Sequence, residues 1–283
     1  ALSTKVGTIV EESKTTVVEN VERLKKEKQT AAVEDKVRDR LKGFARTIPS
    51  FLMAYGNDEV TIDNFDTITK PDVFTEVTSL TPEEFRMLRD GFDYKDPESG
   101  VTKHHDGVFD SENFNVSVED FMKMRRDLAN YFDESAKEDI FDYVPPQKTN
   151  QIFTPKATVR EMVSLLEAEN PGCFDDPDKT FIDLYMKSGM YIAEIVKRLH
   201  NSPKHKELFP DEGERLRHIF AKQVYGLAPT EIIFNIAKNY VLGFDDKVKI
   251  EKHNLRQADA LPYAKEGKVP ELLEELFGGD ERG

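Results

Sequence analysis

The sequence predicts a mainly α-helical region over residues 1–146, followed by an α/β region with a parallel sheet and flanking helices over residues 147–283. Two observations carry this prediction. The first region is charged and helix-prone, with apolar residues at helical spacing. The second alternates helical stretches with short apolar runs suited to buried parallel strands. The proline-containing segment at 144–147 separates the two patterns and marks the expected domain boundary.

In the N-terminal region, the stretch 48–56 is the most apolar and is expected to be buried. Thr81, followed by proline and two glutamates, predicts a capped helix start. Residues 91–113 show little periodicity and predict a loop or a weak hairpin. A further helix is expected over 117–132, with Ser117 as its N-cap.

The C-terminal region predicts strands and helices in alternation. This order implies right-handed crossovers and a parallel sheet with helices on its faces. The expected elements are helices over 157–168, 191–199, 230–242 and 270–277, and strands over 181–185, 223–227 and within 249–257.

The composition of the chain bears on which classes of protein it can belong to. The formal net charge of −14 disfavours direct DNA binding, because nucleic-acid binders present cationic surfaces to phosphates. The single cysteine, Cys173, cannot form an internal disulfide and fits a reducing compartment. No apolar run approaches the roughly 18 residues that span a bilayer, and the six histidines form no metal-binding spacing. We therefore expect a cytoplasmic protein with no membrane partner, which contacts DNA only indirectly, through an assembly.

Ligands of open parallel sheets bind beyond the carboxyl ends of the strands. A nucleotide-like ligand needs a tight turn of small residues after the first strand. Asp183 ends the first expected strand, and Ser188 and Gly189 follow it as a turn. These residues are the first candidates for a binding site.

Two segments resemble N6-adenine DNA methyltransferases of type I and related restriction-modification systems. Asn-Gln-Ile-Phe-Thr-Pro at 150–155 is similar to the segment that opens those domains; its core is Phe153, Thr154 and Pro155. The resemblance implies that this core packs over the methionine end of S-adenosylmethionine. The segment beginning at Asp183 resembles the family's Asp-Pro-Ala-Cys-Gly-Ser-Gly cofactor loop, matched at its aspartate, serine and last glycine.

Two later motifs extend the resemblance. Gly226 lies in Val-Tyr-Gly-Leu-Ala at 224–228, which is similar to the second-strand motif of the family. Asp259 matches the acid of the third motif, which lies near the adenine ring of the cofactor. The resemblance implies a partial Rossmann-like class I methyltransferase sheet with a cofactor site at its edge.

Several departures from the family pattern bear on cofactor binding. Lys187 replaces a loop glycine, and its side chain would crowd the backbone that approaches the ligand. Ala228 replaces the acid that bonds the ribose hydroxyls, and each unpaired hydroxyl costs about 1–3 kcal/mol. The sequence therefore favours weak or absent S-adenosylmethionine binding over tight binding.

The catalytic motif of the family is missing. Adenine methylation uses a short Asp/Asn/Ser-Pro-Pro-Tyr/Phe loop that holds the flipped base, and this sequence contains none. The prolines at 145 and 146 have neither the polar residue that precedes them in the motif nor the aromatic residue that follows them. No catalytic residue is therefore assigned. We expect the front half of a methyltransferase sheet, whose first strand has an open edge that N-terminal helices, a second copy or further chain must cover.

Residues 39–56 resemble a segment that follows the helicase motor in single-chain, ATP-driven restriction enzymes, and the resemblance extends loosely to 147. It implies a helical coupling domain over 1–146 whose partners are other domains or subunits of a restriction-modification complex. No Gly-x-x-x-x-Gly-Lys-Ser/Thr phosphate loop is present, so this sequence holds no ATP site of that kind.

Three hypotheses remain open. The first is a non-catalytic coupling or scaffold fragment that links a helicase motor to DNA-modification or recognition parts. The second is an S-adenosylmethionine-dependent N6-adenine DNA methyltransferase whose catalytic loop lies outside this chain. The third is an unrelated α/β binding domain. The missing catalytic motif favours the first hypothesis, and the matched cofactor residues favour the second.

Overall fold

A computed structural model describes most of the chain and divides it into two compact units, 1–45 and 46–283. The expected helices before residue 38 lie outside the described residues, and so do residues 146 and 147 of the predicted linker at 144–147. The ranges described are 38–96, 99–136, 138–145, 153–245 and 247–278.

The first part of the larger unit is helical, as the sequence predicts. Residues 46–55 form the end of a helix that begins at residue 38, and a hairpin lies where a loop or weak hairpin is expected. The elements that follow are α2 (Pro71–Thr78), α3 (Pro82–Asp90), β1 (Phe92–Lys95), β2 (Thr102–His105), α4 (Ser111–Asp127) and the short helix η1 (Ile140–Tyr143).

Phenylalanine rings build the core of this helical part. Phe51, Phe65, Phe74 and Phe85 are fully buried. The ring of Phe65 lies 4.8 Å from that of Phe51 and 5.7 Å from that of Phe85, centroid to centroid. Most of these contacts are tilted or edge-to-face, the arrangement that the ring quadrupole favours. The predicted burial of 48–56 is therefore confirmed, because this stretch supplies the first ring of the cluster.

Helices α3 and α4 both begin at residues that cap them, but α4 begins earlier than the sequence predicts. Thr81 accepts a hydrogen bond from the N–H of Glu84, whose side chain accepts one from the N–H of Thr81, so the predicted cap is confirmed. The next helix, α4, begins earlier than predicted, because Asp110 caps it through the N–H of Asn113. Ser117 lies inside α4 and donates to the carbonyl of Asn113.

The second part has the predicted alternation of strands and helices. Its elements are α5 (Lys156–Glu169), β3 (Phe181–Asp183), α6 (Met190–Asn201), α7 (Pro203–Leu208), α8 (Glu212–His218), the π-helical turn η2 (Ile219–Gln223), β4 (Val224–Ala228), α9 (Glu231–Leu242), β5 (Asn254–Gln257), α10 (Leu261–Glu266) and α11 (Val269–Phe277).

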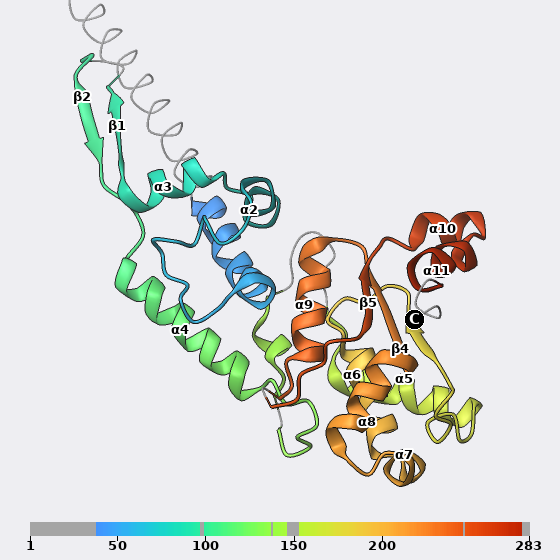
Figure 1. Cartoon of the computed structure of the whole chain (residues 1–283). Helices are drawn as coiled ribbons and strands as arrows, with labels where there is room; N and C mark the ends of the chain where they lie inside the picture. Colours follow the sequence, from blue (N-terminus) through green and yellow to red (C-terminus); the bar gives the residue numbers. More distant parts are fainter. Residues whose placement is uncertain (1–37, 97–98, 137, 146–152, 246, 279–283) are drawn as a thin grey trace, which may run out of the picture. The chain divides into compact units, whose positions relative to one another are not determined.

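The three strands form a parallel sheet in the order β3-β4-β5. Side chains alternate between its faces along β4. Val224 and Ala228 face the main core, which includes α6 and α9. Leu227 faces a smaller cluster formed with α11. Figure 1 shows α9 and α11 on opposite sides of the sheet. The result is a small α/β arrangement with helices on both faces of the sheet.

The helical part and the sheet part are joined by long-range hydrogen bonds. The hydroxyl of Tyr131 donates to the carbonyl of Val241, and the hydroxyl of Tyr240 donates to Asp139 Oδ2, each at 3.0 Å. Both tyrosines are buried in one core cluster with residues of α6 and β4. The domain division at 146/147 therefore stays a prediction, although the secondary structure changes character near it.

Strand β3 lies at one edge of the sheet, and no strand among the described residues pairs with its other side. Ile182, its central residue, is 41% exposed. This agrees with the open first-strand edge that the sequence predicts. In the described ranges, no helix has the length and apolarity required to cross a bilayer.

Candidate cofactor site

Most of the predicted site residues gather at the carboxyl edge of the parallel sheet. Asp183 ends β3 and lies in register with Gly226 of β4. Ser188 and Gly189 form the turn that leads from β3 into α6, and Asp259 follows the end of β5. Because parallel strands end at the same edge, the topology alone brings these residues to one region.

Asp183 is a partly buried carboxylate at this edge of the sheet. Its Oδ1 accepts a hydrogen bond from the N–H of Tyr185 at 3.0 Å. Its Oδ2 has no hydrogen-bond partner in the described part of the chain. Burial raises the pKa of the Asp183 carboxyl above its usual value, and the bond from Tyr185 opposes that rise. A half-buried carboxylate with one open oxygen is suited to accept from an ammonium, amino or hydroxyl group of a ligand.

The turn before α6 has the conformation that its glycine predicts. Gly189 adopts φ +83°, in the left-handed region. A Cβ at this position would lie 2.5 Å from Cγ2 of Val241 and 3.1 Å from the carbonyl oxygen of Ala237. Ser188 is buried and accepts from the N–H of Met190. The turn is therefore fixed by close packing against α9.

Met186 explains a departure from the family motif. The Met186 side chain is fully buried, and its N–H donates to the carbonyl of Leu227 at 2.7 Å. A Cβ on Gly226 would lie 2.7 Å from Sδ of Met186 and 3.1 Å from Cδ2 of Leu255. Gly226 thus makes room for Met186, which anchors the loop after β3 to the end of β4. The role of Gly226 in this structure is packing.

The remaining strand ends differ in exposure. Ala228, which stands where the family has an acid, is fully buried, and its carbonyl accepts from the N–H of Ala258 at 2.8 Å. Asp259 is exposed, and its Oδ1 accepts from the N–H of Leu261 at 3.0 Å. The edge therefore offers an accessible carboxylate after β5 but no acid at residue 228.

The Phe-Thr-Pro segment lies at the start of α5. Pro155 precedes the helix, and its carbonyl accepts from the N–H of Val159. The ring of Phe153 lies 4.6 Å from that of Phe141, so it packs against the main core. Thr154 is half-buried. Among the described residues, these three side chains make no hydrogen bond or ring contact with Asp183.

In the described ranges, histidine, cysteine and carboxylate groups form no cluster that could bind a metal ion. His104 and His105 lie on β2, and His104 pairs with Asp93 across the hairpin.

A protein of Mycoplasma pneumoniae shares sequence similarity with part of this chain. It is described as an uncharacterized adenine-specific methylase, and it is 26% identical over 98 residues. The similar stretch covers 35% of this chain but only 23% of that protein. No family model and no solved structure matches the chain. A part of the chain is therefore similar to a protein described as a methylase. The predicted relationship to helicase-type restriction enzymes stays a prediction.

Proposed function

We propose that this chain forms the cofactor-binding part of an S-adenosylmethionine-dependent adenine methyltransferase, with a partial Rossmann-like sheet. The observation that carries the proposal is Asp183, a half-buried carboxylate with an open Oδ2 beside the tight turn that begins α6. The similarity to an adenine-specific methylase supports the same class of protein. When bound, S-adenosylmethionine would supply an electrophilic methyl group.

The residues present fit this cofactor in part. Asp183 would accept from its ammonium group, and the turn at Ser188 and Gly189 would admit its methionine end close to the backbone. Asp259 offers a second, exposed acceptor for the adenine amino group. Ala228 offers none for the ribose hydroxyls, so we expect binding that is weak compared with that of a site carrying an acid there.

Calorimetric titration with S-adenosylmethionine up to millimolar concentration tests the proposal. Saturable binding is expected, and Asp183→Asn should weaken it at least about tenfold because a charge-assisted hydrogen bond is lost. The asparagine keeps an oxygen that accepts from the N–H of Tyr185, so the loop is preserved. Asp178→Asn, which removes an exposed carboxylate before β3, is the matched control and should bind like the unaltered chain.

Two outcomes would overturn the proposal. The first is no heat from a chain shown to be folded by circular dichroism. The second is equal affinity in Asp183→Asn and the unaltered chain.

The alternative proposal is a non-catalytic coupling or scaffold module within a restriction-modification assembly. It is favoured by the missing Pro-Pro-aromatic motif and by the hydrogen bonds of Tyr131 and Tyr240, which tie the helical part to α9. It predicts that a well-folded chain gives no heat with S-adenosylmethionine. It also predicts no retardation of duplex DNA by the isolated chain, whose net charge is −14.

A further inference from the structure

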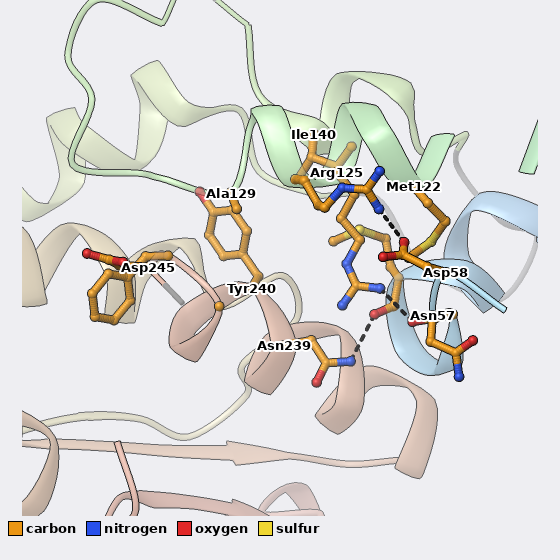
Figure 2. Close-up of a pocket in the computed structure, with 14 residues that line it drawn as sticks. Asn57, Asp58, Met122, Arg125, Ala129, Ile140, Asn239, Tyr240 and Asp245 are labelled. Atoms are coloured by element: carbon orange, nitrogen blue, oxygen red, sulfur yellow. Dashed lines mark hydrogen bonds and ion pairs between the residues drawn. The ribbon is translucent and has the colours of Figure 1, made fainter. Parts of the chain in front are cut away.

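A pocket of about 340 Å³ lies outside the candidate cofactor site. Its walls come from the end of the helix over 38–55 and the residues after it, from α4, from η1 and from the end of α9 (Figure 2). Helix α9 begins after the carboxyl end of β4 and runs back along the sheet, so this pocket lies toward the opposite edge from Asp183 and Asp259. The volume is within the range of small-molecule sites, roughly 300–1,000 Å³.

Two side chains converge on one helix end beside this pocket. Nη1 of Arg125 donates to the carbonyls of Leu52 and Gly56, at 2.9 and 3.1 Å. Nδ2 of Asn239 donates to the carbonyls of Met53 and Ala54, both at 3.0 Å. These bonds satisfy the last carbonyl groups of the helix and fix both side chains in place.

The guanidinium of Arg125 keeps unused donors. Both of its hydrogen bonds come from Nη1, so the N–H groups of Nη2 and Nε remain without a protein acceptor among the described residues. In the same ranges no carboxylate forms an ion pair with it. The neighbouring Asp58 pairs instead with Arg126. Burial lowers the pKa of Arg125, and the negative charge of Asp58 opposes that shift.

The other residues that line the pocket indicate which kind of anion it can hold. Met53, Met122, Ile140 and Phe244 supply apolar surface. Oδ1 of Asn239 accepts no hydrogen bond from the described chain, so it is open to a ligand donor. Asp58 and Asp245 also line the pocket and would repel a doubly charged phosphate. These features favour a single negative charge on an apolar body.

We propose that this pocket binds a small organic carboxylate, whose charged group pairs with the free edge of the Arg125 guanidinium and whose apolar body lies against Met53, Met122 and Phe244. An Arg–carboxylate pair in a half-buried site forms charge-assisted hydrogen bonds. The net charge of −14 repels anions at long range, so these local contacts carry the binding. The inference is independent of the proposed methyltransferase function.

Ligand-detected NMR with benzoate tests this site, with benzamide as the neutral analogue of the same size. Saturable benzoate binding is expected, with benzamide at least about tenfold weaker because the charge-assisted bonds are lost. Arg125→Gln should abolish the difference between the two probes. Arg217→Gln, at an exposed position of α8, removes the same charge elsewhere and should leave benzoate binding unchanged.

Arg125→Gln could disturb the fold, because Arg125 also holds the end of a helix. A second variant therefore tests the proposal without changing Arg125. Asp58→Asn removes the nearest negative charge and frees Arg126, so benzoate should bind several-fold more tightly. The proposal is wrong if benzoate and benzamide bind alike, if benzoate does not bind at tens of millimolar, or if Asp58→Asn leaves benzoate affinity unchanged.

Discussion

The helical part and the sheet part of the larger unit are stabilised in different ways. The helical part buries phenylalanine rings against one another, and Phe65 contacts the rings of Phe51, Phe74, Phe85 and Phe114. The sheet part buries mostly aliphatic side chains and depends on close backbone approach at Gly189 and Gly226. The close backbone approach at Gly189 and Gly226 holds the loop after β3, where the candidate site lies.

The largest expected effect is in the ring cluster. Phe65→Ala should lower the free energy of unfolding by about 3–5 kcal/mol, because it removes a fully buried aromatic ring and leaves a cavity. Urea denaturation measures the change. Val116→Ala, at a position that is 50% exposed on α4, is the control and should change stability by less than about 0.5 kcal/mol. A loss below about 1 kcal/mol for Phe65→Ala would contradict the proposed core.

A smaller effect is expected at the packed glycine. Gly226→Ala should cost about 1–3 kcal/mol through overpacking, because its new methyl group would meet Met186 and Leu255. The same substitution in a Met186→Ala background should cost less, since the sulfur it would strike is gone. Urea denaturation of the four proteins gives the coupling energy. Additive effects would show that Met186 is not what requires the glycine.

A smaller effect is expected at the N-cap of α4, where the structure and the sequence prediction assign different capping residues. Asp110→Ala should lower stability by about 1 kcal/mol through loss of the N-cap. Ser117→Ala should change it by less than about 0.5 kcal/mol, because that serine lies inside the helix. Thermal and urea unfolding of both variants separate the two assignments, and a larger loss for Ser117→Ala would restore the original prediction.

The smallest effect is expected from pH. His205 is fully buried, and its Nε2 lies 2.8 Å from Oε1 of Gln223. Burial lowers the pKa of His205, and of His200, below the ordinary value of 6.5. The unfolded chain therefore takes up protons first on acidification. The stability that these groups contribute is complete above pH 6.5 and is lost as the pH falls below it.

Denaturation at pH 7.5 and pH 5.5 measures this loss. Replacing His205 with glutamine should reduce the loss between the two pH values, whereas replacing the exposed His104 on β2 with glutamine is the control. An equal loss in the His205 variant and the unaltered chain would contradict the assignment.

Local signals in the sequence predicted much of the fold. The helices α5, α6 and α9 and the strands β3 to β5 follow from apolar runs, and Thr81 from its capping pattern. The grouping of Asp183, Gly189 and Asp259 at one edge follows from parallel topology. The sequence also shows that the loop after Asp183 matches the family pattern only in part, but the packing of Met186 against Gly226 is visible only in three dimensions.

What the sequence could not predict depends on contacts between distant segments. Arg125 and Asn239 meet the same helix end across sequence separations of 73 and 186 residues. No local pattern distinguishes Arg125 from the adjacent, exposed Arg126. The buried partners of Tyr131 and Tyr240 are equally remote. A residue pattern predicts which segments form helices but not which side chains meet between them.

Hydrogen–deuterium exchange with and without saturating S-adenosylmethionine tests the central claim most directly, because it reports where the cofactor binds. The account predicts slower exchange in the loop over 184–190 and after β5 over 258–261, and no such change in Asp183→Asn. Binding that slows exchange only elsewhere, or leaves both segments unchanged, would contradict a cofactor site at the carboxyl edge of the sheet.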